Sequence, residues 1–143
     1  MTTPDEVARA SADAMWSGDA ASKALGMQLV SVGPGTATLS MTVREDMING
    51  WDLCHGGLIA SLADSAFAFA CNSHNLVTVG AGCTIDYLAP GRLRDVLTAT
   101  AVEQALAGKS GVYDVKISNQ DGRAIALFRG KSHRVSGEVV PQT

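Results

Sequence analysis

Residues 56–74, GGLIASLADSAFAFACNSH, form the one segment of this chain that is apolar at nearly every position of a helix. The segment is rich in Ala and Leu and contains no Pro, a composition that favours an α-helix. A helix that is apolar nearly all the way round is buried by other elements and does not lie on a surface. Any fold for this chain must therefore place its other elements around this helix.

Strand signals lie on both sides of the helix. Residues 36–43 alternate apolar and polar side chains, which gives a strand one apolar face. Gly, Pro and Asn residues separate the strand-like runs, as turns require. The predicted strands cover residues 28–32, 36–43, 77–88, 96–106, 111–118 and 124–135. These elements predict an α+β fold with a central helix packed on one antiparallel sheet, and the pattern alone leaves the strand order open.

The two ends of the chain differ from its middle. Residues 1–25 predict a helical segment in two pieces, because apolar residues recur at helical spacing up to Met15 and Gly18 then interrupts the pattern. The polar residues 136–143 predict a flexible tail. With 143 residues and neither a linker nor a repeat, the chain is predicted to form a single domain over residues 1–143.

Charge and composition limit what the protein binds and where it works. The formal net charge of −3 provides no basic field, which argues against nucleic-acid binding. The N-terminus has no basic region followed by an apolar run, so no signal peptide is expected, and no apolar stretch approaches the roughly 20 residues that span a bilayer. Cys54, Cys71 and Cys83 fit no disulfide framework and predict reduced thiols in a cytoplasmic protein.

Asp64 is the residue that least fits its surroundings. It lies about two turns into the apolar helix and shares a face with small residues that include Gly57, Ala68 and Cys71. A carboxylate that is buried without a partner is costly, or its pKa rises until it is neutral. An Asp at such a position is paired, faces the surface, or is tuned for chemistry. The residues alone leave these three interpretations open.

The start of the helix adds a second feature. His55-Gly56-Gly57 places two residues without side chains where free backbone N–H groups and the positive end of the helix project. This arrangement suits a polarised carbonyl or a developing oxyanion, although two glycines also suit a tight entry turn. The combination of such a site with Asp64 on the same helix, preceded by polar Asn49 and His55, favours an enzyme.

Two other kinds of site are less well supported. Cys54 beside His55 suggests a Cys–His nucleophile, but adjacent residues rarely point at each other in a catalytic geometry, and a lone Cys is more often a packed small apolar residue. The His, Cys and Asp residues show no metal-ligand spacing. No metal and no cofactor is therefore expected.

Several motifs together resemble one family. The run NGWDLCHGG at 49–57, continued by SLAD at 61–64, resembles the PaaI-type hotdog thioesterases, small acyl-CoA hydrolases associated with bacterial phenylacetate degradation. The resemblance extends over nearly the whole chain. It includes ALG at 24–26, CTIDYL at 83–88 followed by Pro90-Gly91, TATA at 98–101, GVYD at 111–114 and FRGKSHR at 128–134.

The resemblance implies a hotdog fold, in which a curved antiparallel sheet of five to six strands wraps a long central helix. It also implies sheets paired edge to edge between two subunits, and usually a homotetramer. In this family the thioester carbonyl lies against the backbone N–H at the position of Gly56. The carboxylate at the position of Asp64 comes from the other subunit and either attacks or activates water. Asn49 and His55 match supporting positions.

The substrate that the resemblance implies is an aryl-acyl-CoA, phenylacetyl-CoA or a ring-hydroxylated phenylacetyl-CoA. The phosphates of CoA need local cations on an otherwise acidic protein. The candidates for CoA contacts are Gly57, Lys109, Arg129, Lys131 and Arg134.

Two alternative functions remain. A hotdog hydratase or dehydratase would use His55 as its main base on an acyl-CoA, and a non-enzymatic module would bind acyl-CoA and release nothing. The position of Asp64 argues for the thioesterase against both.

Overall fold

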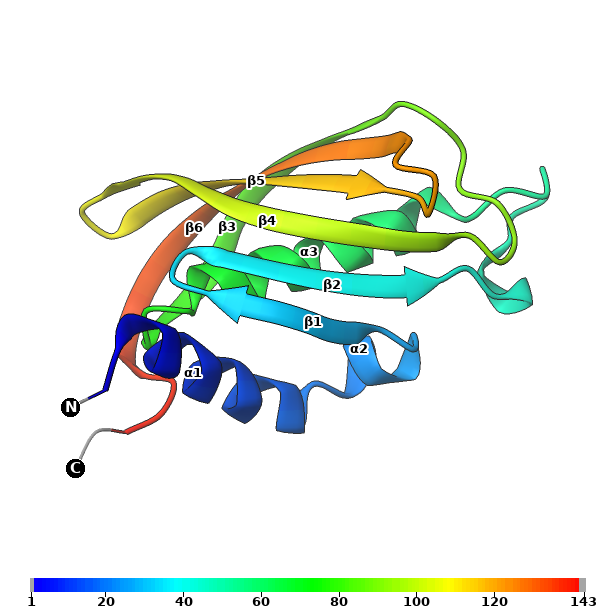
Figure 1. Ribbon diagram of the computed structural model, residues 1–143. Coiled ribbons are helices and arrows are strands. Elements are labelled where there is room, and N and C mark those ends of the chain that lie inside the picture. The colour runs from blue at the N-terminus through cyan, green and yellow to red at the C-terminus, as the bar shows by residue number, and fades with distance from the viewer. Residues whose placement is uncertain (1, 142–143) are drawn as a thin grey trace.

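The computed structural model describes residues 2–141 and shows one sheet curled around one long helix (Figure 1). The helices are α1 (Pro4–Gly18), α2 (Ala20–Ala24) and α3 (Gly56–Cys71), with a short 3-10 helix, η1, at Glu45–Met47. The strands are β1 (Gln28–Gly33), β2 (Thr36–Thr42), β3 (Leu76–Tyr87), β4 (Val96–Ala107), β5 (Ser110–Ser118) and β6 (Ala124–Glu138). These bounds confirm the predicted strands, and α1 and α2 lie within residues 1–25.

The sheet has six antiparallel strands in the order β1-β2-β4-β5-β6-β3. The hairpins β1–β2, β4–β5 and β5–β6 join neighbours in sequence, whereas β3 crosses over to pair with β6 at one edge. This topology, with α3 against the concave face, confirms the predicted fold. It leaves β3 as an edge strand whose last residue, Tyr87, contacts the start of the helix.

Local sequence signals explain where the first two helices begin and end. The side chain of Thr3 accepts a hydrogen bond from the Glu6 N–H at the start of α1, and Pro4 follows it in the first turn. Asp19 ends α1 and caps α2 by accepting from the Ser22 N–H. Gly26 then turns the chain into β1 with a φ of 71°, a conformation that favours glycine.

The core fills the space between α3 and the concave face of the sheet. The Phe67 ring lies 5.7 Å from the Tyr113 ring and 5.8 Å from the Phe128 ring, measured between centroids. The Gly130 backbone lies against the Phe67 ring, so close that a Cβ added there would come within 2.8 Å of the ring. Close packing of this kind makes α3 an internal support for the whole sheet.

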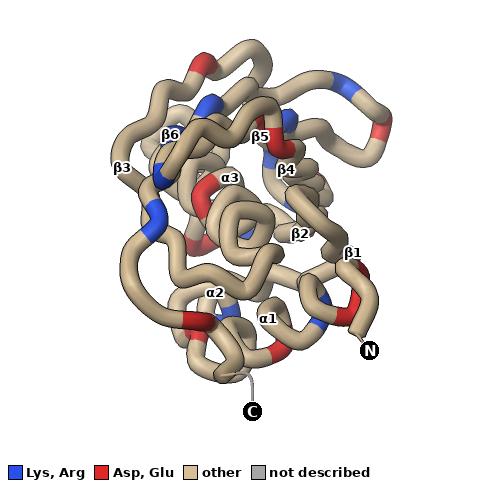
Figure 2. Tube along the Cα trace, turned by 90° about the vertical axis from the view of Figure 1, so that its left-hand side faces the viewer, with Lys and Arg blue, Asp and Glu red and all other residues tan. Residues whose placement is uncertain are grey.

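The prediction that α3 is buried all round is wrong on one face. Seen roughly along its axis, α3 is surrounded by the sheet above and by α1 and α2 below (Figure 2). Leu62, Ala63 and Ala66 are fully buried, yet Gly57 and Asp64 remain exposed in the single chain. Cys71, predicted on the Asp64 face, is buried because the sheet closes over the end of the helix.

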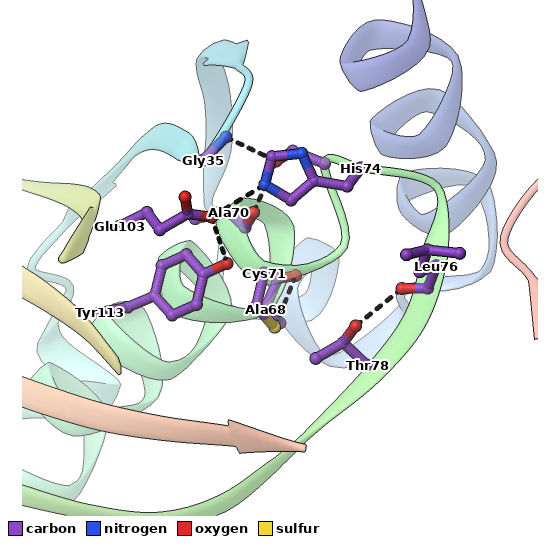
Figure 3. Close-up of polar contacts among 10 residues, drawn as sticks. Gly35, Ala68, Ala70, Cys71, His74, Leu76, Thr78, Glu103 and Tyr113 are labelled. Carbon is purple, nitrogen blue, oxygen red and sulfur yellow. Dashed lines mark hydrogen bonds and ion pairs between the residues drawn. The ribbon is translucent and has the colours of Figure 1, made fainter. Parts of the chain in front are cut away.

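Polar side chains close the fold at the C-terminal end of α3 (Figure 3). One carboxylate oxygen of Glu103 accepts from the Tyr113 hydroxyl at 2.8 Å and bonds His74 Nε2 at 2.8 Å. Ser73 Oγ accepts from the Gly35 N–H at 2.7 Å and donates to the Ala70 carbonyl. These bonds tie β4, β5 and the β1–β2 turn to the helix.

The chain does not become a tail at Ser136, where a flexible segment was predicted. β6 continues to Glu138, and the N–H groups of Val139 and Val140 donate to Asn75. Backbone pairing outweighs the polar composition here, because Asn75 supplies hydrogen-bond partners that the sequence pattern does not reveal. The last two residues of the predicted tail, 142–143, lie outside the described residues. Among residues 2–141, no helix has the length and apolar character needed to cross a membrane.

Candidate active site

The start of α3 carries one free backbone donor. The Nδ1 atom of His55 accepts a hydrogen bond from the Gly57 N–H at 3.2 Å and so caps the helix. Leu58 and Ile59 donate their N–H groups to the His55 carbonyl. Within residues 2–141, no hydrogen bond uses the Gly56 N–H. Gly56 therefore offers an unpaired donor at the positive end of a helix.

Tyr87, the last residue of β3, holds Gly56 from the sheet side. Its hydroxyl donates to the Gly56 carbonyl at 2.8 Å. A Cβ at Gly56 would come within 3.2 Å of the tyrosine ring, so a glycine there lets the ring rest against the backbone. The sequence pattern did not predict a role for Tyr87 at the helix start, because this contact joins residues far apart in the chain.

Two clefts flank the start of the helix. The first, of about 390 Å³, contains Asn49, Gly56 and Tyr87 among its lining residues. The second, of about 370 Å³, is lined by η1 residues together with His55 and Gly57. Volumes of this size are typical of small-molecule sites. The structure thus brings four of the predicted site residues, Asn49, His55, Gly56 and Gly57, to one place.

Asn49 shapes the loop before the helix. Its side-chain oxygen accepts from the N–H groups of Trp51 at 2.9 Å and Leu53 at 3.2 Å. Asp52 adopts a φ of 59° within this turn. The Asn49 oxygen is therefore occupied by the loop, and its amide N–H₂ group is what remains for a ligand.

Asp64 lies apart from these residues. It stands eight residues beyond Gly56 on α3, a rise of about 12 Å along the helix. Its side chain opens into a third cleft, of about 280 Å³, between α2 and α3. Although one side of Asp64 is exposed, the surrounding protein partly desolvates the carboxylate and raises its pKa. No ion pair of the described residues involves Asp64.

The structure disfavours Cys54 as a nucleophile. Cys54 is 5% exposed. Burial, with a smaller contribution from the charge of Asp95, raises the pKa of its thiol. A thiol with a raised pKa carries little of the thiolate form that attacks. All three cysteines are free. Among residues 2–141, no three His, Cys, Asp or Glu side chains gather to hold a metal ion.

The four predicted cations do not gather in one place. Lys109 and Arg134 line the same small cleft at the C-terminal end of α3, where the Arg134 N–H donates to the Lys109 carbonyl at 2.7 Å. Arg129 lies on the outer face of the sheet and forms a two-pronged ion pair with Asp114 at 2.6 and 2.7 Å. Lys131 is exposed on β6.

The aromatic side chains divide into core and surface. Phe67 and Phe69 are 2% and 1% exposed and belong to the core. Trp51 and Tyr87 are 84% and 49% exposed and lie on the segments beside Gly56. Of these four aromatic residues, only Trp51 and Tyr87 can meet a ligand near the helix start.

Comparison with known proteins shows the family of this chain. A family model described as the thioesterase superfamily matches residues 52–126, which include the helix start, Asp64 and β3. The chain belongs to the thioesterase superfamily. A relative within it, acyl-coenzyme A thioesterase PaaI of Escherichia coli, is 51% identical over 128 residues, 90% of this chain and 91% of that protein.

Solved structures of the superfamily have the same fold. The E. coli PaaI protein from the phenylacetic acid degradation operon superposes with a TM-score of 0.94 at 48% identity, over 95% of this chain and 99% of that chain. A hypothetical thioesterase of Streptococcus pneumoniae, solved with coenzyme A, gives a TM-score of 0.75 at 25% identity, over 78% of this chain and 90% of that chain.

Proposed function

We propose that this protein is an acyl-CoA thioesterase that hydrolyses aryl-acyl-CoA, phenylacetyl-CoA or its ring-hydroxylated forms, to the free acid and CoA. The observation that carries the proposal is the unpaired Gly56 N–H at the positive end of α3. The 51% identity to an acyl-CoA thioesterase from E. coli supports the substrate class. The E. coli PaaI protein comes from the phenylacetic acid degradation operon, and this origin supports the aryl group.

The Gly56 N–H polarises the thioester carbonyl. The carbonyl oxygen accepts this hydrogen bond at the helix terminus, and the negative charge that develops in the transition state strengthens it. The Asp64 carboxylate either takes a proton from an attacking water or attacks the carbonyl carbon itself, forming an anhydride that water then opens. In both routes the C–S bond breaks and the CoA thiolate leaves.

The reacting groups come from two subunits. Gly56 and Asp64 of one chain are separated by about 12 Å along α3, too far for both to touch one thioester carbonyl. The exposed face of α3 and the open edge of β3, exposed at every residue from Val79 to Thr84, are available for a second copy. Pairing β3 with its copy would bring Asp64 of the partner subunit to Gly56.

The same pairing suggests where CoA lies. Thr78 of β3 pairs with Arg134, roughly 30 Å along the strand from Tyr87. In an antiparallel pair, the start of one strand lies beside the end of the other. We therefore propose that Lys109 and Arg134 of the partner subunit bind the CoA phosphates near Gly56. Arg129, whose charge Asp114 neutralises, and Lys131 stay predictions without such support.

The helix cap argues against the hydratase alternative. Because His55 Nδ1 accepts from the Gly57 N–H, the neutral ring carries its proton on Nε2. In that form His55 can donate a hydrogen bond to the substrate, but it has no free lone pair with which to act as a base. His55 therefore supports the carbonyl site, and Asp64 remains the group that can accept a proton.

We also propose a homotetramer built from two such dimers. The outer face of the sheet carries a hollow of about 780 Å³ lined by exposed Val102 and Leu127 and by Asp114 and Arg129. Apolar groups with charges of both signs can match a second copy of the same face across a two-fold axis. Sedimentation velocity tests the assembly, with a tetramer expected. The cytoplasmic location stays a prediction from the sequence.

The decisive experiment measures thiol release from a panel of CoA esters: phenylacetyl, hydroxyphenylacetyl, benzoyl, and short and long straight chains. The Asp64→Ala variant serves as the inactive control, and its melting temperature verifies the fold. We expect release that favours the aryl esters and is lost in the variant. Binding without release would support the binding module, and a change in enoyl absorbance without thiol release would support the hydratase.

A further inference from the structure

The cleft beside Asp64 has a polar wall built from three residues of α2, its N-cap and α3. Asp19 caps α2, Ser22 lies in α2, and Ser65 follows Asp64 on α3. Ser22 Oγ lies 2.7 Å from an Asp19 carboxylate oxygen and 2.8 Å from Ser65 Oγ. All three residues line the 280 Å³ cleft into which Asp64 opens.

The direction of these hydrogen bonds follows from the chemistry of the groups. A carboxylate can only accept, so the single hydroxyl proton of Ser22 points to Asp19. Ser22 can then only accept in its contact with Ser65, which makes Ser65 the donor. The proton of Ser65 is thereby used, and Ser65 Oγ faces the cleft as a pure acceptor. Ser22 is 2% exposed, which keeps water from competing for these bonds.

The remaining walls of the cleft suit the acyl part of a substrate. Leu25, Met27 and Ala68 supply apolar surface. The hydroxyl of Ser61, also in the lining, donates to the Gly57 carbonyl at 2.8 Å and so directs its proton away from the cleft. The cleft, of about 280 Å³, has room for a small acyl group.

We infer that Ser65, oriented by Ser22 and Asp19, is a specificity-determining residue that accepts a hydrogen bond from a hydroxyl on the acyl group. This inference rests on the proposed function, because it assumes that Asp64 meets the thioester. Acyl groups whose hydroxyl reaches Ser65 are then preferred over the unsubstituted group. An oxygen that can only accept, such as a methoxy oxygen, finds no donor at Ser65 and is disfavoured.

The test compares kcat/KM for phenylacetyl-CoA, its three ring-hydroxylated isomers and the matching methoxy esters. In the wild type we expect one hydroxylated isomer to exceed phenylacetyl-CoA by about three- to tenfold, the range that one neutral hydrogen bond supplies. Ser65→Ala should remove that ratio. Ser61 Oγ also has its proton engaged, by the Gly57 carbonyl, and is therefore the competing acceptor in this cleft. Ser61→Ala should preserve the ratio whatever its effect on the absolute rate, and loss of the ratio in Ser61→Ala would overturn the assignment to Ser65.

Ser22→Ala provides the readout that a purely structural role would not change. Without Ser22, the Ser65 hydroxyl regains a proton to donate, so the ratio of the hydroxy to the methoxy ester should fall toward unity. Melting temperatures verify that each variant is folded. The inference would be overturned if the ratio of hydroxylated to unsubstituted ester were the same in the wild type and Ser65→Ala, or if no hydroxylated isomer were preferred. Thiol release in the same assay would still support the thioesterase. If no ester released thiol, the proposed function itself would be refuted, and the inference with it.

Discussion

Complementation between two inactive variants tests whether the active site is shared between subunits. One variant, Asp64→Ala, removes the carboxylate. The other, Gly56→Pro, removes the backbone N–H. Proline suits this position because Gly56 is the first residue of α3, and because His55 has the extended conformation, φ −58° and ψ 128°, that a residue before proline prefers.

The structure predicts the size of each effect. Loss of one oxyanion donor lowers turnover by about two to three orders of magnitude, and we expect loss of Asp64 to cost at least as much. Gly56→Ala is the matched control, since its Cβ meets the Tyr87 ring at 3.2 Å in the same way but keeps the N–H. It should retain far more activity than Gly56→Pro.

The mixture of the two variants should recover activity that neither has alone. If Gly56 of one subunit works with Asp64 of the partner subunit, random exchange in an equal mixture makes about one quarter of all sites intact. The assay is thiol release before and after subunit exchange. If both groups acted within one chain, no exchanged site would be intact. A mixture as inactive as its parents would therefore refute the two-subunit site.

Three further predictions concern ionisation and packing. Desolvation raises the pKa of Asp64, so the stability of the protein should fall as pH rises from the ordinary Asp pKa through the raised one. Asp64→Asn should therefore have a higher melting temperature than the wild type at pH 7, and this difference should vanish in acid. Gly130→Ala should destabilise the protein by about 1–3 kcal/mol in urea unfolding, because its Cβ would meet the Phe67 ring at 2.8 Å. Gly18→Ala is the control: its Cβ would point into open space, so this change should be neutral or stabilising. Tyr113→Phe removes a buried hydroxyl that donates to Glu103 and should cost about 0.5–1.5 kcal/mol in the same assay, and an unchanged urea midpoint would contradict it.

Much of the fold was predictable because its signals are local. The helix and strands follow from side-chain periodicity and turn residues, which act over a few positions along the chain. Asp64 stood out because a carboxylate in an apolar helix is conspicuous without any knowledge of how the helix packs. Gly56 stood out because the first N–H groups of a helix are free by geometry.

Only the tertiary structure decided which of these groups meet. It showed that His55 occupies the Gly57 N–H and leaves that of Gly56 free, and that Tyr87 rests on Gly56 from the end of β3. It also placed Ser22 against Ser65, a contact between residues 43 positions apart. Such contacts depend on how the strands are ordered and how the sheet curves, and neither is encoded in the period of any one segment. For the same reason the sequence did not reveal that one face of α3 stays open. That face carries the small and polar residues Gly57, Ser61 and Asp64, which suit either close packing or exposure. It is open because a single sheet can wrap only part of the helix.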